Sequence, residues 1–501
     1  MALSWTGSTK AVTRSQSGNY LTLSLMVLAV AAVVPVAATA QAVPKQAAVG
    51  QTIAEQTAPV PTVALNREQA VLLAEQRLRA GDAPAALLVL ENVITYLGDS
   101  HGVRLLQSSA AQASGDLVLA AKAAKQAWRL ATDRTTRFRA AQMAAQVAAR
   151  RSRKLEVKLW LRRTTQNAPN DRVRAMVARD YRIARRYDPW QRRFSFSLTP
   201  SNNLNGGSSS DVLIVDGVDL EGVLSPDAQA LSGLRLRAGV DLKYRLKPTS
   251  RSMTSLGFRS DITRNYLSSD AQDLAPDVRN SELNYTLSEV SISQKRALAA
   301  RPGGGTAAVL SYGAAVGQTW YGGEDLTSYQ RLNLGWARNL AAGKRLSTSA
   351  TVESQTALTS GSSDSLSWKL GGRFGRPMGN GDRISFSLGA TLVDADSINS
   401  TWRGLDLGLI YQIKAPLAGA QLSLSLGLDY RDYSAFDLGI YMAPGGRQDQ
   451  GVRAGITAVL PQIQYMGFAP VLSLDLARRR SNVSRYESRD LGLGLSFRSA
   501  F

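Results

Sequence analysis

The stretch Asp490-Leu-Gly-Leu-Gly-Leu-Ser-Phe-Arg-Ser-Ala-Phe501 decides the fold class of this chain. In an extended chain its apolar side chains point one way, and its small or polar side chains point the other. The apolar set is Leu491, Leu493, Leu495 and Phe497. This period of two predicts a β-strand, and the sequence stops on the aromatic Phe501. Such a strand closes bacterial outer-membrane barrels, in which closure leaves no unpaired backbone edge facing lipid.

The same alternation recurs through the preceding three hundred or so residues. The clearest runs, 233–246, 382–393 and 420–433, carry a uniform apolar row over the length that a tilted strand needs to cross a bilayer. Runs between turn-like gaps predict about fourteen strands, near 193–199, 233–246, 252–265, 281–293, 306–318, 329–339, 345–357, 365–375, 382–393, 402–414, 420–433, 450–460, 468–479 and 489–501. An even number suits a barrel with both ends in the periplasm. Residues 189–501 are therefore predicted to form a transmembrane antiparallel β-barrel.

The first forty residues have the pattern of a secretory signal. Lys10 and Arg14 precede an apolar run, and Ala38-Thr39-Ala40 fits a small-x-small cleavage site. A transmembrane anchor is the alternative, but the apolar run is short and no stop-transfer charge cluster follows it. We therefore expect a signal peptide at 1–40 and, because 41–62 is rich in Ala, Gln, Val and Pro without periodicity, a linker after it.

Residues 63–188 have a helical pattern with a repeat. Gly81-Asp82 and Gly115-Asp116 lie 34 residues apart, and small residues recur at the same offset. This is the tetratricopeptide period, in which small side chains let paired helices approach closely. A third copy is degenerate, with Arg150-Arg151 expected in place of Gly-Asp, and a plain helical bundle is the alternative. We expect α+β multidomain architecture, with an all-α tetratricopeptide-like domain before the barrel.

Tetratricopeptide geometry places the first helix of each repeat on the inner, concave surface. The predicted groove residues are Glu75 and Leu78 and, one repeat later, Ser109 and Gln112.

The helical segment is strongly basic, with 25 Lys and Arg against 11 Asp and Glu between Val63 and Arg193, a net charge of +14. Arg150, Arg151 and Arg153 form one predicted basic face. Nucleic acid rarely meets an exported chain, so acidic polypeptide cargo or anionic lipid headgroups are the expected partners. A solvated basic surface without a partner is the alternative.

The residues needed for common catalytic chemistry are missing. Cysteine is absent and His101 is the single histidine, in the helical segment. These counts argue against a histidine-based hydrolase, a zinc site and thiolate chemistry. We expect no enzyme activity, no cofactor and no metal.

Two motifs at the ends of the predicted barrel resemble those of the surface lipoprotein assembly modifier family. One is Asn203-Leu204-Asn205 after the first strand, and the other is Ser481-Asn482-Val483-Ser484-Arg485-Tyr486 before the last. Members often have Asp-Ser-Asn ahead of the first turn, where this chain has Pro200-Ser201-Asn202-Asn203. The likeness covers the architecture from about residue 63 to 501, with its motifs at the two ends of the barrel.

The resemblance implies an outer-membrane translocator. Its helical domain would receive surface lipoproteins or related secreted proteins in the periplasm, and its barrel would pass them. The expected lumen-lining cations are Arg235, Arg237, Lys243 and Arg245. The final strand and Phe501 resemble the signal that barrel-assembly machinery reads. Expected partners are therefore polypeptide cargo, outer-membrane lipids and that machinery, with the protein acting as a monomer.

Two other functions fit the same sequence pattern. Helical repeats joined to an outer-membrane barrel also serve polysaccharide export, in which a basic lumen would pass an anionic polymer. The third possibility is a passive porin with a periplasmic appendage.

Overall fold

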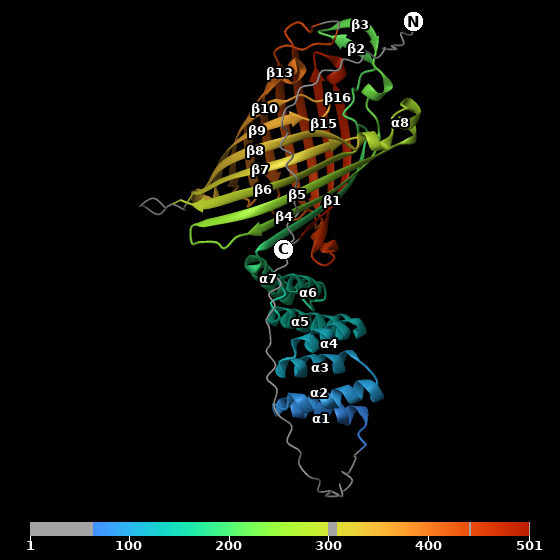
Figure 1. Ribbon diagram of the computed structural model, residues 1–501, viewed down its shortest axis with the longest axis vertical. Coiled ribbons are helices and arrows are strands. Elements are labelled where there is room, and N and C mark those ends of the chain that lie inside the picture. The colour runs from blue at the N-terminus through green and yellow to red at the C-terminus, as the bar shows by residue number, and fades with distance from the viewer. Residues whose placement is uncertain (1–63, 299–307, 440–441, 500–501) are drawn as a thin grey trace, which may run out of the picture. The chain divides into compact units, whose positions relative to one another are not determined.

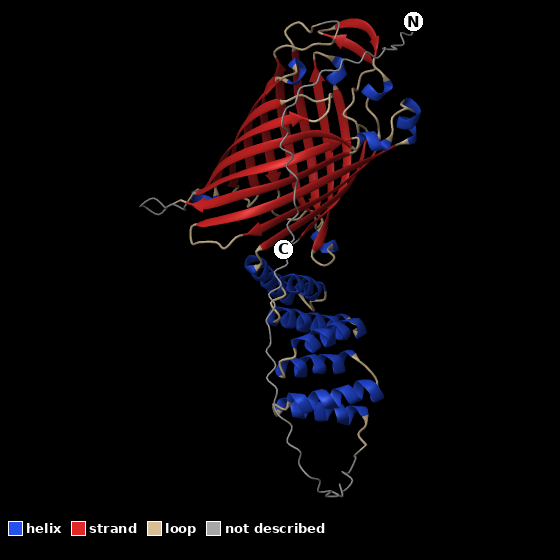
Figure 2. Ribbon diagram, in the orientation of Figure 1, coloured by secondary structure: helices blue, strands red, loops and turns tan. Residues whose placement is uncertain are grey.

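The computed structural model describes residues 64–298, 308–439 and 442–499 (Figures 1 and 2). The expected signal peptide, the linker and the terminal Phe501 lie outside these residues.

The helical region consists of consecutive helices that contact their neighbours in chain order. They are α1 (Arg67–Arg79), α2 (Ala83–Asn92), α3 (His101–Ala113), α4 (Leu117–Leu130), α5 (Arg134–Arg150), α6 (Lys154–Gln166) and α7 (Asp171–Tyr187), with a π-helical turn Val93–Leu97 continuing α2. Most start at a side-chain cap, such as Asn66 for α1 and Asn170 for α7, which satisfies free backbone N–H groups. Short turns join α1 to α2, α3 to α4 and α5 to α6, so the helices form successive hairpins.

Alanine dominates the core between these helices. Ala74, Ala86, Ala110, Ala120 and Ala141 are fully buried. Because a methyl group fills so little space, the helix axes can approach closely, and larger residues such as Leu90 and Trp160 complete each layer. The 34-residue repeat of small residues therefore corresponds to repeated helix-crossing points.

The three hairpin turns differ in one informative way. Gly81 and Gly115 adopt left-handed backbone with φ of 85° and 87°, and the aspartate after each caps the following helix. In the third hairpin this conformation falls on Ser152, with φ of 56°, and Arg153 follows without a side-chain cap. The expectation that Arg150-Arg151 takes the place of Gly-Asp is wrong, because α5 has 17 residues where α3 has 13, which moves the turn along the chain.

The fourteen predicted strands are confirmed as one closed antiparallel barrel (Figure 2). The barrel strands are β1 (Trp190–Ser201), β4 (Gly233–Arg245), β5 (Ser252–Leu267), β6 (Tyr285–Ala297), β7 (Val309–Tyr321), β8 (Glu324–Asn339), β9 (Arg345–Ala357), β10 (Ser365–Pro377), β11 (Arg383–Ala395), β12 (Trp402–Gln412), β13 (Gln421–Tyr433), β14 (Arg447–Val459), β15 (Phe468–Ser481) and β16 (Ser488–Ser499). Each strand pairs with its sequence neighbour, and β1 pairs with both β4 and β16.

Apolar side chains cover the outside of the barrel. Phe194, Leu332, Leu388 and Leu493 are each about half exposed or more, as a lipid-facing surface requires. Polar residues and glycines alternate with them and face the lumen. Two aromatics near strand ends, where a membrane-interface girdle would place them outward, face inward: Tyr329 is buried beside Glu289, and Tyr433 is buried against Arg447. Each ring finds a polar or cationic partner there that lipid does not offer.

The two ends of the barrel differ. We call the end at which β1 begins and β16 finishes the helical end, because α7 leads directly into β1. We call the opposite end the far end. There the connection 202–232 between β1 and β4 contains a hairpin, β2 (Val212–Val215) and β3 (Val218–Val223), that sequence reasoning missed.

The motif residues hold this far-end connection in place. The Asn205 side chain accepts from the Leu231 N–H and donates to the Gln229 carbonyl, and Ser484 Oγ donates to the Val212 carbonyl. The packing is close, since a Cβ on Gly207 would lie 2.1 Å from the carbonyl oxygen of Gln229. Residues of both motifs therefore hold the 202–232 connection in position at the far end of the barrel.

Replacing Ser152 with Gly should stabilise the helical region by about 1 kcal/mol, because glycine adopts positive φ without the steric cost that serine bears. Urea unfolding of the full protein in detergent, followed by helical circular dichroism, measures the change. Gly115→Ala is the matched control and should shift the midpoint the other way. Equal midpoints for the parent and Ser152→Gly would contradict the interpretation.

Candidate functional site

The seam between β1 and β16 is the least regular pairing in the barrel. Its register is defined at Ser197↔Ser496, Leu198↔Leu495 and Ser201↔Gly492, whereas β15 and β16 pair continuously from Phe468↔Ser499 to Arg479↔Ser488. Pro200 lies in this stretch of β1 and has no N–H to donate to a neighbour. The seam therefore has fewer ladder hydrogen bonds to break than the other strand pairs.

One side chain completes the seam at the far end. Asn202 donates through Nδ2 to the Arg489 carbonyl, at 2.9 Å, and accepts through Oδ1 from the Leu491 N–H, at 2.8 Å. Its amide thus replaces a peptide group where β1 has ended and β16 continues.

A polar cavity of ≈ 770 Å³ lies inside the barrel along this seam. Its charged lining residues are Arg235, Arg237, Asp406, Arg453, Asp475 and Asp490, and serine side chains such as Ser197 and Ser496 fill the spaces between them. Both signs of charge therefore meet in the lumen, close to the two closing strands.

Ion pairs join lumen-facing side chains on different barrel strands. Arg453 contacts Asp429 at 3.3 Å. Arg331 lies between Glu289, at 3.0 Å, and Glu353, at 2.5 Å, and Tyr329 donates to Glu289. These contacts connect adjacent strands, and in the case of Glu289 and Arg331 strands two apart, from the inside and neutralise part of the lumen charge.

The four cations predicted to line the lumen occupy different places along β4. Arg235 donates to the carbonyls of Asn203 and Leu204, so it ties the far-end connection to the wall, while Arg237 lines the cavity. Lys243 is half exposed, 4.0 Å from Asp241. Arg245 lies at the helical end, where it donates to the carbonyls of Arg186 and Asp188 at the end of α7. The structure therefore does not gather these four residues into one basic row.

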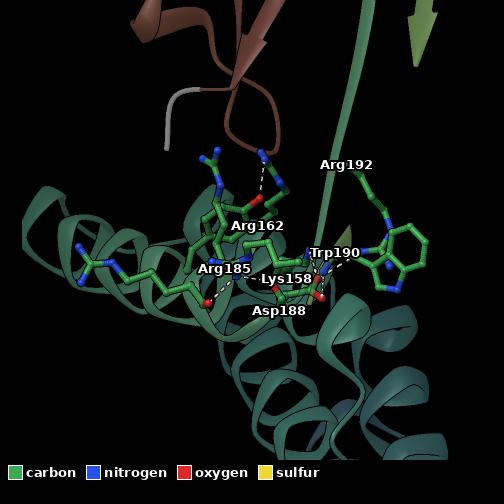
Figure 3. Close-up of polar contacts among 9 residues, drawn as sticks. Lys158, Arg162, Arg185, Asp188, Trp190 and Arg192 are labelled. Atoms are coloured by element: carbon green, nitrogen blue, oxygen red, sulfur yellow. Dashed lines mark hydrogen bonds and ion pairs between the residues drawn. The ribbon is translucent and has the colours of Figure 1, made fainter. Parts of the chain in front are cut away.

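A buried carboxylate joins the helical region to β1 (Figure 3). Asp188, 2% exposed, accepts from Lys158 of α6 at 2.5 Å and from Arg192 of β1 at 3.2 Å. Its other oxygen accepts from the Trp190 N–H at 3.0 Å. One side chain thereby ends α7, starts β1 and attaches α6 to both.

A second contact joins α6 to β16 and to the turn before β15. Arg162 donates to the Met466 carbonyl at 2.9 Å and to Ser499 Oγ at 2.9 Å. Its guanidinium lies over the rings of Tyr181 and Phe468, at 4.7 and 4.3 Å from their centroids. An arginine that stacks on an aromatic face can still donate hydrogen bonds in the plane of its guanidinium, so Arg162 makes both kinds of contact. Helix α6 thus contacts β16 directly and is joined to β1 through Asp188.

The Asp188 pKa is lowered overall. Burial raises this pKa, but the hydrogen bonds from Lys158 and the Trp190 N–H and the charges of Lys158 and Arg192 together outweigh burial. Because the pKa of Asp188 is lower in the folded protein than its unfolded value of 3.8, the ionised carboxylate stabilises the junction at pH values above 3.8. This stabilisation is lost as the pH falls through the folded-state pKa of Asp188. The junction is therefore an ion-pair cluster that is intact at neutral pH.

The predicted groove residues lie on α1 and α3 and are all partly exposed. Glu75 pairs with Arg79, Leu78 packs against the first helical core, and Ser109 bonds within its own helix. Gln112 contacts Met143 of α5, and its carbonyl accepts from Arg150 at 3.0 Å. The predicted groove thus meets one member of the predicted basic face, while Arg151 and Arg153 lie at the α5–α6 turn.

The junction residues were missed at the sequence level. Asp188 could be recognised only as part of the Asp-Pro pair that ends the helices, and nothing in the sequence marks Arg162 among the many arginines of the segment. Among the described residues no group of His, Cys, Asp and Glu is arranged to hold a metal ion. No helix in the described part of the chain is long and apolar enough to span a membrane.

A closed, even-stranded antiparallel barrel with an apolar outer surface and a polar interior defines a bacterial outer-membrane barrel protein. No family model matches the chain, and no curated protein matches its sequence. Similar solved structures include a BenF-like porin from Pseudomonas fluorescens Pf-5, at 10% identity and a TM-score of 0.34, covering 61% of this chain and 98% of the porin. CdiB from Acinetobacter baumannii has 13% identity and a TM-score of 0.34, over 61% of this chain and 59% of CdiB. Pseudomonas putida OprB has 11% identity and a TM-score of 0.33, over 65% of this chain and 96% of OprB.

Replacing Asp188 with Asn should loosen the junction by roughly 3 kcal/mol, because Lys158 would lose its buried counter-charge. Trypsin cleavage after Arg185 and Arg186 in the full protein should accelerate. Acidification toward pH 3 should increase the local unfolding of α7 in the parent, where Asp188 becomes protonated, but not in the variant. Hydrogen exchange of the α7 amides measures this difference.

Asp171→Asn is the matched control, since its ion pair with Arg174 is 92% exposed on the aspartate side and contributes little. Equal cleavage rates for Asp188→Asn, Asp171→Asn and the parent would show that the buried cluster does not hold the junction.

Proposed function

We propose that the protein is an outer-membrane translocator, in which the periplasmic helical region receives a polypeptide and the barrel carries it outward. The cargo class is surface lipoproteins or related secreted proteins. One observation carries the proposal: α6 is joined to both closing strands, to β1 through the bridging carboxylate of Asp188 and to β16 directly through Arg162. A receptor attached there can pass a force or a displacement to the loosest strand pair in the barrel.

The seam supports this mechanism physically. Opening a strand pair within a bilayer exposes backbone groups that lipid cannot satisfy. The cost is smallest where few ladder bonds exist, and the β1–β16 register is defined at three residue pairs. A polypeptide strand entering the seam would supply the missing backbone partners, as in β-augmentation. The seam is therefore the proposed path or insertion point for cargo.

The helical region supports a receptor role through its charge. Lys122, Lys125 and Arg153 are exposed and Arg151 is partly exposed, and none of the four makes an ion pair within the described residues. Unpaired surface cations raise the association rate of an acidic partner, and salt screens that attraction. An acidic segment of the cargo is accordingly the proposed ligand of the helices.

A passive porin is the second candidate, since the ≈ 770 Å³ polar cavity is compatible with small solutes. Polysaccharide export is less favoured, because Lys243, Arg331 and Arg453 each lie within ion-pair distance of a carboxylate and offer little charge to a polyanion. Opening of the β1–β16 seam distinguishes the translocator from the porin, because a porin conducts solutes through its lumen while the barrel wall stays closed.

A disulfide across the seam should stop export. The chain has no cysteine, so Ser197→Cys with Ser496→Cys introduces two thiols at directly paired residues. Paired strand positions lie within the Cα separation that a disulfide spans. Surface display of a co-expressed candidate cargo should fall at least about tenfold under oxidation and recover with reductant.

Ser255→Cys with Ser293→Cys is the matched control, because it joins two directly paired serines on β5 and β6, away from the seam. Display should be unaffected by this second disulfide. If both disulfides leave display unchanged while solutes still permeate, the seam mechanism fails and the porin function stands.

Reversing Arg150, Arg151 and Arg153 to Glu should slow cargo capture by about tenfold at low salt, with the difference shrinking at high ionic strength. Surface plasmon resonance on the full protein in nanodiscs measures the association rate. Lys122→Glu, Lys125→Glu and Arg129→Glu change the same charge on exposed positions of α4. An equal effect of both triple variants would indicate general electrostatics without a defined basic face.

A further inference from the structure

Three arginines form a cluster on the outer surface of the barrel near the far end. Leu476 and Leu491 are exposed on the lipid-facing surface, and Arg478 and Arg489 each lie two residues farther along the same strand face. Arg480 continues the row on β15. All three side chains are exposed, and Arg478 and Arg489 are direct cross-strand partners.

The cluster lies at the edge of the apolar surface. Arg478 is ten residues from Phe468, which contacts Arg162 at the helical end. At about 3.3 Å per residue and a tilt near 40°, this separation is about 25 Å across the membrane, the height of a barrel's apolar band. The arginines therefore reach the level of lipid headgroups in the leaflet opposite the helices.

This arrangement is electrostatically unfavourable without a counter-ion. Like charges directly opposite each other on neighbouring strands destabilise a sheet. Within the described residues none of the three arginines makes an ion pair. Outward-facing Arg403, also near the far end, shows the usual arrangement, with Asp432 on the next strand at 2.8 Å. The cluster thus lacks the carboxylate that its neighbour has.

Two adjoining grooves on the outer surface flank the end of β16. One, of ≈ 690 Å³, is lined by the three arginines and by residues that include Gln450, Val452, Leu476 and Asp490, of which Asp490 also lines the lumen cavity. The other, of ≈ 560 Å³, is mostly apolar and is lined by Leu234, Tyr266 and Leu493 among others. Asn202 and Leu491 line both grooves. A ligand with an anionic head and several hydrocarbon chains fits this pairing of surfaces.

We propose that Arg478, Arg480 and Arg489 form a binding site for the phosphoryl groups of an anionic glycolipid in the outer leaflet, with its acyl chains along the apolar groove. Guanidinium groups bind phosphate through paired, charge-assisted hydrogen bonds, and one phosphoryl group can bridge Arg478 and Arg489. The inference rests on the placement of the barrel in a membrane with the helical region on the periplasmic side, and it is independent of the translocation function.

Native mass spectrometry of the full protein in detergent, titrated with diphosphorylated lipid A, tests the site. The parent should retain one tightly bound lipid. Arg478→Gln with Arg480→Gln and Arg489→Gln should weaken binding at least about tenfold, which corresponds to the loss of one or more charge-assisted contacts. Equal binding by the parent and the triple variant would overturn the proposal.

The matched control replaces Arg264, Arg338 and Arg376, outward-facing arginines on other strands, with Gln, and it should retain the lipid. Heat-modifiable gel migration verifies that both triple variants are folded. Two further ligands, lipid A without its phosphates and inorganic phosphate alone, test whether the site needs both the phosphoryl groups and the lipid. Equal binding of lipid A lacking its phosphates, or equal affinity for inorganic phosphate alone, would each contradict a phosphoglycolipid site.

Discussion

Every backbone N–H and C=O group within a bilayer must find a partner inside the protein, and the fold depends on this constraint. Thirteen of the fourteen strand pairs meet it between sequence neighbours, including the β1–β4 pair across the inserted connection. The remaining pair, β1 with β16, joins the two ends of the barrel domain and meets it least regularly. Asn202 supplies a side-chain amide where the peptide ladder ends. The barrel is therefore closed, but the β1–β16 pair is held together by fewer backbone hydrogen bonds than the other strand pairs.

The helical region is attached to the barrel at this β1–β16 seam. Asp188 is buried with two cations, and breaking such a cluster costs more than breaking exposed pairs elsewhere in the helices. Arg162 adds a contact to the end of β16 that combines hydrogen bonds with stacking. Because both contacts come from α6, a movement of that helix acts on β1 and β16 together. A helix attached at a distance from the seam would lack this coupling.

Alternation of side chains was enough to predict all fourteen barrel strands, because lipid outside and polar lumen inside impose the same period on each of them. The 34-residue repeat likewise predicted the first two helix hairpins. The β2–β3 hairpin was missed because its strands, of four and six residues, are too short to show a clear alternation, and the third helical turn was misplaced because α5 is longer. Tyr329 and Tyr433 could not be assigned to the lumen from their positions near strand ends. The contacts of Asp188 and Arg162 depend on residues far away in sequence, which no local pattern encodes.

The far-end connection has a consequence for the order of assembly. Ser208 Oγ donates to the carbonyl of Ser484, which is 276 residues later in the chain. An intramolecular contact across so long a loop cannot form until the intervening strands are in place, and its entropic cost falls on the last step of folding. Val215 and Val483 meet in the same contact, buried with Phe436. Complete docking of this connection therefore requires a finished and closed chain, because a truncated chain lacks the Val483–Ser484 segment that Ser208 and Val215 contact.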